Sequence, residues 1–128
     1  MKSFVAAMIV GMFVGAFAPD VAAAEAVAVA PGVVSGATAK ALAAGGAKVV
    51  DVRTPQEFAA GHVPGAINIP FDELPRRAAE IGPPSSKVVL YCRTGRRSGI
   101  AADALRKAGF NQLYDFQSVT AWPGELVK

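Results

Sequence analysis

The sequence predicts an α/β fold in which a mostly parallel sheet is covered by helices on both faces. Two observations carry this prediction. Short apolar segments typical of buried strands recur along the chain, and segments with helix start and stop signals lie between them. Strands that alternate with helices favour parallel pairing, because each crossover packs on a face of the sheet. The length of 128 residues allows one domain.

The first 24 residues are interpreted as a secretory signal peptide. Residues 4–18 contain no charged residue and follow Lys2, and the small residues Ala22-Ala23-Ala24 predict cleavage before Glu25. A retained anchor is the alternative, but the apolar run is shorter than the roughly 20 residues that a spanning helix needs. We therefore expect an exported, periplasmic protein that has no membrane contact after cleavage.

Residues 25–35 are rich in Ala, Val and Gly without a helical or strand period, and we expect a flexible leader there. The folded domain is expected over residues 36–128. Thr38 is expected to cap a short helix that ends before Gly45-Gly46, and residues 48–52 are expected to form the first buried strand.

The next two helices and one strand follow from local signals. Thr54-Pro55-Gln56-Glu57 is a capping box with proline at the first helical position, which predicts a helix that ends near Gly61. Residues 66–69 are a second apolar strand. Asp72 is expected to cap a helix that runs toward residue 81, with Pro75 tolerated in its first turn.

The last elements are a strand over residues 87–91, a helix over 98–108 and a strand over 113–116. The helix is the longest of the chain, and Gly109 is its expected stop. Its apolar face is predicted to contain Ile100, Ala104, Leu105 and Ala108.

Composition excludes several classes of function. The net charge of +3 is too small to indicate a nucleic-acid protein, but Lys and Arg residues cluster in the region 87–107, which favours a small anion as partner. One cysteine, Cys92, excludes an internal disulfide, and with His62 as the one histidine a Cys/His zinc site is not expected. We expect neither a metal nor a cofactor.

The segment after the third strand is the candidate functional loop. Cys92 stands at the carboxyl end of that strand, where ligands bind in parallel sheets, and Gly95 can adopt the positive φ that lets successive N–H groups converge. The dipoles of these N–H groups and the positive charges of the nearby arginines favour the thiolate and lower the pKa of the Cys92 thiol. Such a thiolate is nucleophilic without a histidine base. The alternative is a small buried core residue, which most unpaired cysteines are.

These residues resemble the rhodanese domain of sulfurtransferases over about residues 35–125. The motifs that carry the resemblance are Asp51-Val52-Arg53, Glu57-Phe58, Gly61-His62-Val63-Pro64-Gly65-Ala66-Ile67-Asn68-Ile69-Pro70, Tyr91-Cys92 with Gly95 and Arg97-Ser98, and Ala121-Trp122. Within this family the chain resembles single-domain exported rhodaneses that act on thiosulfate.

The resemblance implies a rhodanese-like fold with five strands and a two-step transfer of sulfane sulfur. Cys92 would take sulfur from thiosulfate as a persulfide and pass it to cyanide or a thiol. The amides of Arg93, Thr94, Gly95, Arg96, Arg97 and Ser98 would cradle the sulfur. Arg93 and Arg96 are candidates for binding the anionic donor, whereas Arg97 is expected to fix the loop.

Four further positions have open or structural interpretations. Asp51 and Arg53 either brace the loop by charge-assisted hydrogen bonds or cap the helix that begins at Pro55, and both interpretations stay open. His62 is interpreted as structural, with a general base as the alternative. Trp122 is interpreted as a core residue.

One departure from the family stands beside the resemblance. Gln117-Ser118 replaces the usual two glycines, and these side chains either narrow the site entrance or force a different turn.

Three other functions remain as alternatives. A sulfur carrier that serves a partner protein needs the same persulfide. Phosphatases and arsenate reductases of this architecture usually have five residues between cysteine and arginine, whereas four separate Cys92 from Arg97 here.

We expect the protein to be a monomer.

Overall fold

The computed structural model describes residues 29–128 of the chain. The expected signal peptide, its expected cleavage site and the start of the expected leader lie outside the described residues. In the part that is described, no helix is long and apolar enough to cross a membrane.

A five-stranded parallel sheet forms the centre of the molecule, in the spatial order β1-β5-β4-β2-β3. The strands are β1 (Gly32–Val33), β2 (Lys48–Asp51), β3 (Ile67–Asn68), β4 (Val88–Cys92) and β5 (Leu113–Ser118). The predicted fold class and the five parallel strands are confirmed. All five residues of the central strand β4 are buried, because both faces of the sheet are covered.

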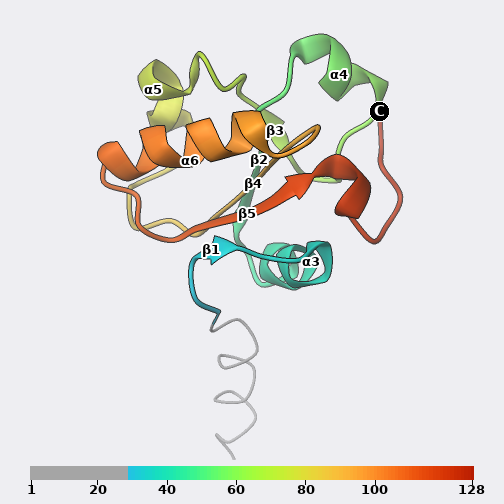
Figure 1. Cartoon of the computed structure of the whole chain (residues 1–128), viewed down its shortest axis with the longest axis horizontal. Helices are drawn as coiled ribbons and strands as arrows, with labels where there is room; N and C mark the ends of the chain where they lie inside the picture. Colours follow the sequence, from blue (N-terminus) through green and yellow to red (C-terminus); the bar gives the residue numbers. More distant parts are fainter. Residues whose placement is uncertain (1–28) are drawn as a thin grey trace, which may run out of the picture.

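Helices lie on both faces of the sheet, as Figure 1 shows, with α6 and α5 on one side and α3 on the other. The helical elements are α3 (Gly36–Ala44), α4 (Pro55–Ala60), α5 (Leu74–Arg77), η2 (Ala78–Glu80), α6 (Arg96–Lys107) and η3 (Val119–Ala121). Leu74, Leu90 and Leu105 belong to the core under α5 and α6, whereas Leu42 and Tyr91 belong to the core on the α3 side. The sheet thus separates two apolar cores.

The expected leader contains a strand that its composition did not indicate. Gly32 and Val33 pair with Tyr114 and Asp115 of β5, and the Val34 N–H donates to the Asp115 carbonyl at 3.0 Å. Both residues of β1 are exposed, so the segment shows no burial pattern. The described part of the leader is therefore the edge of the sheet.

Two helix caps differ from the expected ones. Ser35 caps α3 in place of Thr38, and its hydroxyl accepts from the Thr38 N–H at 3.0 Å. Glu73 precedes α5 without a side-chain cap, so Asp72 does not cap this helix, which continues as η2. The capping box of α4 is confirmed in full.

The longest helix in residues 29–128, α6, begins at Arg96, two residues before the expected start. Its buried residues are Ser98, Ala101, Ala102 and Leu105, whereas Ile100 and Ala108 are exposed. The predicted apolar face was therefore wrong at Ile100 and Ala108, whereas Leu105 is buried and Ala104 half-buried. The reason is that small residues, which carry little hydrophobic signal, allow α6 to lie close to β4 and β5.

Candidate active site at the Cys92 loop

Cys92 ends β4 and begins the loop that leads into α6. The residue is completely buried, and its Sγ accepts a hydrogen bond from the Gly95 N–H at 2.9 Å. Gly95 has φ +110°, a left-handed conformation that glycine adopts without a steric penalty, and it is the N-cap residue of α6. The loop thus folds back on the sulfur at the positive end of a helix.

The pKa of the Cys92 thiol is lowered from its ordinary value. Burial acts in the opposite direction and raises the pKa, but hydrogen bonds from the backbone and side chain of Ser98 and from the backbones of Gly95 and Thr94 outweigh it. The direction agrees with the expectation from the sequence. No histidine takes part in this arrangement.

Replacing Ser98 with alanine is expected to raise the Cys92 pKa, because the Ser98 hydroxyl lowers this pKa and also donates to the Gly95 carbonyl in the loop at 3.2 Å, whereas the burial remains. The measurement is the rate of alkylation of Cys92 by iodoacetamide between pH 5 and pH 10, followed by mass spectrometry. An unchanged midpoint in Ser98→Ala would show that the backbone amides alone stabilise the thiolate.

Arg97 connects the start of α6 to α4. Its Nη1 and Nη2 donate to the two carboxylate oxygens of Glu57 at 2.8 and 3.1 Å, and both side chains are half-buried. Glu57 also accepts from the Thr54 N–H in the capping box, so one carboxylate closes the helix cap and holds the arginine. Arg97 therefore has the loop-fixing position that the sequence suggested, whereas its partner Glu57 was assigned to the cap alone.

The Glu57–Arg97 ion pair makes stability depend on acid pH. The hydrogen bond from Arg97, which outweighs the opposing effect of burial, lowers the pKa of Glu57 from 4.5 to about 2. The ion pair therefore stabilises the folded protein fully above pH 4.5, and this stabilisation is lost as the pH falls toward 2.

We expect Glu57→Gln to lower the melting temperature at pH 7, because glutamine keeps the cap but removes the charge. The melting temperatures of the variant and the wild type should converge as the pH falls toward 2. Thermal unfolding of both proteins from pH 7 to pH 2 measures this. A constant difference over that range would mean that the charge of Glu57 contributes nothing.

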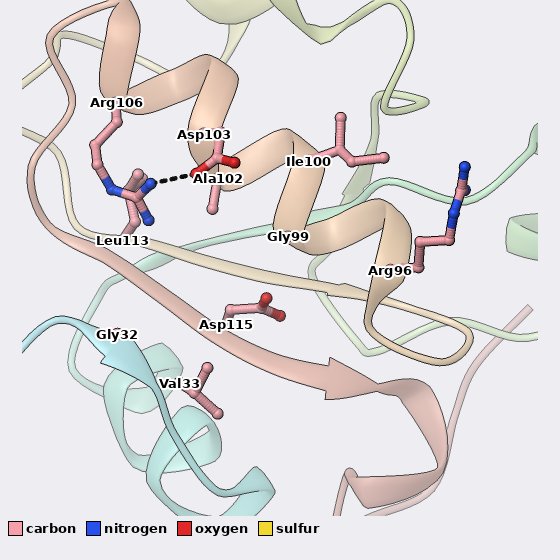
Figure 2. A pocket seen from close by; sticks show the side chains of 10 residues that line it. All are labelled: Gly32, Val33, Arg96, Gly99, Ile100, Ala102, Asp103, Arg106, Leu113 and Asp115. Carbon is pink, nitrogen blue, oxygen red and sulfur yellow. Dashed lines mark hydrogen bonds and ion pairs between the residues drawn. The ribbon is translucent and has the colours of Figure 1, made fainter.

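Arg93 and Arg96 are the exposed cations of the loop. Among residues 29–128 neither forms an ion pair with an acidic side chain, so both are open to an anionic ligand. Figure 2 shows Arg96 at the first turn of α6, at one end of a cavity of about 400 Å³ whose opposite end holds the Asp103–Arg106 ion pair. Cys92 does not line this cavity.

Asp51 and Arg53 form a buried ion pair at the carboxyl end of β2. Arg53 Nη2 lies 2.6 Å from Asp51 Oδ2, and the same nitrogen donates to the Gly61 carbonyl at 2.6 Å. Thr54 is the N-cap residue of α4 and Gly61 is its C-cap residue, so Arg53 contacts the C-terminal end of this helix rather than its start. The ion pair contacts the strand that ends at Cys92 through Tyr91. The Arg53 guanidinium carbon lies over the Tyr91 ring, 5.5 Å from its centroid.

His62 and Trp122 are held by structural contacts. The His62 ring stacks on Phe58 with the centroids 3.7 Å apart, its Nδ1 lies 2.9 Å from the Phe58 carbonyl, and its backbone forms a β-bridge with Val127. Trp122 is half-buried and packs against Phe116 with the ring centroids 5.7 Å apart. Both contacts support the structural interpretations.

The residue pair Gln117-Ser118 lies beside the loop at the carboxyl end of β5. In the β4–β5 register Tyr91 faces Gln117 and Cys92 faces Ser118, with a bulge just before them. Asp115 Oδ1 accepts from the Gln117 N–H at 2.8 Å. The sequence indicated Gln117 as a departure, whereas the role of Asp115 was missed, although a carboxylate within an apolar strand was a signal for it.

The chain matches the family model of the rhodanese-like domain over residues 36–122. A sulfurtransferase from Allochromatium vinosum is 39% identical over 75 residues, which cover 58% of this chain and 69% of the relative. The thiosulfate sulfurtransferase PspE of Escherichia coli is 40% identical over 65 residues, which cover 50% of this chain and 62% of PspE.

A solved structure described as a rhodanese with anions from E. coli superposes with a TM-score of 0.60 at 33% identity, over 63% of this chain and 96% of that one. The family model spans the sheet from α3 to Trp122 and includes the whole Cys92 loop. The chain belongs to the rhodanese-like domain family.

Proposed function

We propose that this protein is a thiosulfate sulfurtransferase that carries sulfane sulfur on Cys92. The observation that carries the proposal is the buried sulfur of Cys92, which accepts a hydrogen bond from the Gly95 N–H at the start of α6. Such a cradle stabilises a negative sulfur, and therefore stabilises both the thiolate and a persulfide. The names of the A. vinosum and E. coli relatives support sulfur transfer and, in the second case, thiosulfate as donor.

The reaction has two balanced steps. The Cys92 thiolate attacks the outer sulfur of thiosulfate, a bond forms between the two sulfurs, and the bond to the inner sulfur breaks with its electron pair leaving on sulfite. In the second step cyanide or a thiolate attacks the outer sulfur of the persulfide. Thiocyanate or a new persulfide leaves, and the Cys92 thiolate is restored without an outside oxidant or reductant.

The loop residues have distinct roles in this proposal. Arg93 and Arg96 are exposed at the loop and attract the dianionic donor, whereas Arg97 is held by Glu57 and keeps the start of α6 in place. The backbone N–H groups of Ser98 and Gly95 donate hydrogen bonds to the sulfur. We further propose, from the pattern of residues 1–24, that the protein is exported to the periplasm.

The test is the intact mass of protein from the exported fraction, measured before thiosulfate, after it, and after subsequent cyanide. We expect a chain that begins at Glu25, gains one sulfur atom and then loses it as thiocyanate is released. Sulfur uptake without repeated turnover on small molecules would identify a carrier that serves a partner protein. Hydrolysis of an aryl phosphate without sulfur uptake would identify an oxyanion enzyme instead.

A further inference from the structure

Gln117 has a strained backbone at the edge of the Cys92 loop. In residues 29–128 it is the one residue other than glycine with a positive φ, at +70°. A side chain in the left-handed region costs conformational free energy, and strain of this kind persists where the surrounding structure enforces it, often beside a functional site. Glycine would adopt the same conformation without strain.

Two features of β5 hold Gln117 in this conformation. The β4–β5 register shifts between Leu90 and Tyr91, so that the pairing moves from Asp115 to Gln117 and leaves Phe116 as the extra residue of a bulge. The Asp115 carboxylate then accepts the Gln117 N–H at 2.8 Å from a buried position. The bulge re-aims the Gln117 side chain from the sheet toward the loop.

The Gln117 side chain packs against the loop at Gly95. A methyl group added at Gly95 would lie 3.1 Å from Gln117 Cβ, 3.4 Å from Cγ and 3.5 Å from Cδ. Gly95 is also the donor to Cys92 Sγ, so the glutamine lies directly beside the residue that cradles the sulfur. Gln117 is exposed to solvent, whereas Cys92 has no exposed surface.

We propose that Gln117 is a specificity-determining residue, which narrows the approach to Cys92 and restricts sulfur transfer to small donors and acceptors. The inference rests on the proposed function. Thiosulfate, cyanide and small thiols would pass the glutamine side chain. Thiols carried on peptides or proteins would be excluded, because the long Gln117 side chain, on a constrained backbone, occupies the edge of the loop beside Gly95.

The test compares two thiol reagents that share one reactive group but differ in size, N-ethylmaleimide and fluorescein-5-maleimide. Rates of modification of Cys92 are measured by mass spectrometry for the wild type, Gln117→Gly and Gln117→Asn. We expect Gln117→Gly to raise the ratio of the large-reagent rate to the small-reagent rate by about tenfold. Asparagine also tolerates the left-handed region but is one methylene shorter, and is expected to give an intermediate ratio.

Gln56→Ala serves as the matched control, since Gln56 is an exposed glutamine on α4, and it is expected to leave the ratio unchanged. An unchanged ratio in both Gln117 variants would overturn the proposal. An equal rise of both rates would also overturn it, because a more reactive thiolate or a looser loop affects both reagents alike.

The same variants are then assayed for sulfur transfer from thiosulfate to cyanide and to glutathione. We expect Gln117→Gly to raise the ratio of the rate of sulfur transfer to glutathione to the rate of transfer to cyanide. The rise should be by about the same factor as the rise in the maleimide ratio. A wild type that transfers no sulfur would contradict the proposed function, but the maleimide ratios would still decide whether Gln117 restricts access. A rise in the maleimide ratio without a change in acceptor preference would contradict the specificity role alone.

Discussion

Cys92→Ser is expected to lower thiocyanate formation from thiosulfate and cyanide by at least about a thousandfold, because a serine hydroxyl stays protonated where the thiol ionises. The cradle around the sulfur stabilises a thiolate, as the lowered pKa of Cys92 indicates. The measurement is the initial rate of thiocyanate release at saturating thiosulfate. Intact mass after thiosulfate should show no added sulfur.

The control for this variant is its stability, since Cys92 is fully buried. Serine occupies nearly the same volume, and Cys92→Ala tests the same loss of nucleophile without a buried hydroxyl. Both variants are expected to unfold cooperatively and to be equally inactive. Sulfur transfer that survives in either folded variant would remove Cys92 from the reaction.

Arg53→Met is expected to lower the free energy of unfolding by about 3–5 kcal/mol, because it leaves the Asp51 carboxylate buried without its partner. Asp51 has no exposed surface, and Arg53 contacts it through Nε and Nη2 at 2.6 to 3.0 Å. The same variant removes the hydrogen bond to the Gly61 carbonyl and the cation above the Tyr91 ring. Denaturant unfolding at pH 7 measures the loss.

The double variant Asp51→Asn/Arg53→Met separates the charge from the packing. With the carboxylate also neutralised, we expect it to be less destabilised than Arg53→Met, since no uncompensated charge remains. If the single and double variants are equally unstable, the packing of the arginine rather than its charge holds the end of β2.

Much of the fold was predictable because its signals are local. The capping box at Thr54 and Glu57 specifies the start of α4 within four consecutive residues, and the apolar runs of β2 and β4 are long enough to identify as buried strands. The position of Cys92 at the end of β4 follows from the same run. These elements are determined by neighbours in the sequence.

The remaining features depend on partners far away in the sequence. β1 is an exposed pair of residues that becomes a strand because β5 lies beside it. The bulge that places Gln117 beside Gly95 comes from the pairing of β5 with β4, and no local pattern marks it. The pairing of Arg97 with Glu57 required the packing of α6 near α4. Tertiary contacts of this kind are not encoded in a short window of sequence.

The order of the strands determines when this protein can finish folding. β5 lies between β1 and β4, so β1 joins the sheet through a strand near the other end of the chain. A nascent chain that has not yet released residues 113–118 from the ribosome has an open edge on β4 and no partner for β1. Because such long-range pairing comes late, β4 keeps an open edge, and the apolar faces of the sheet stay exposed to chaperones, until residues 113–118 are free to pair.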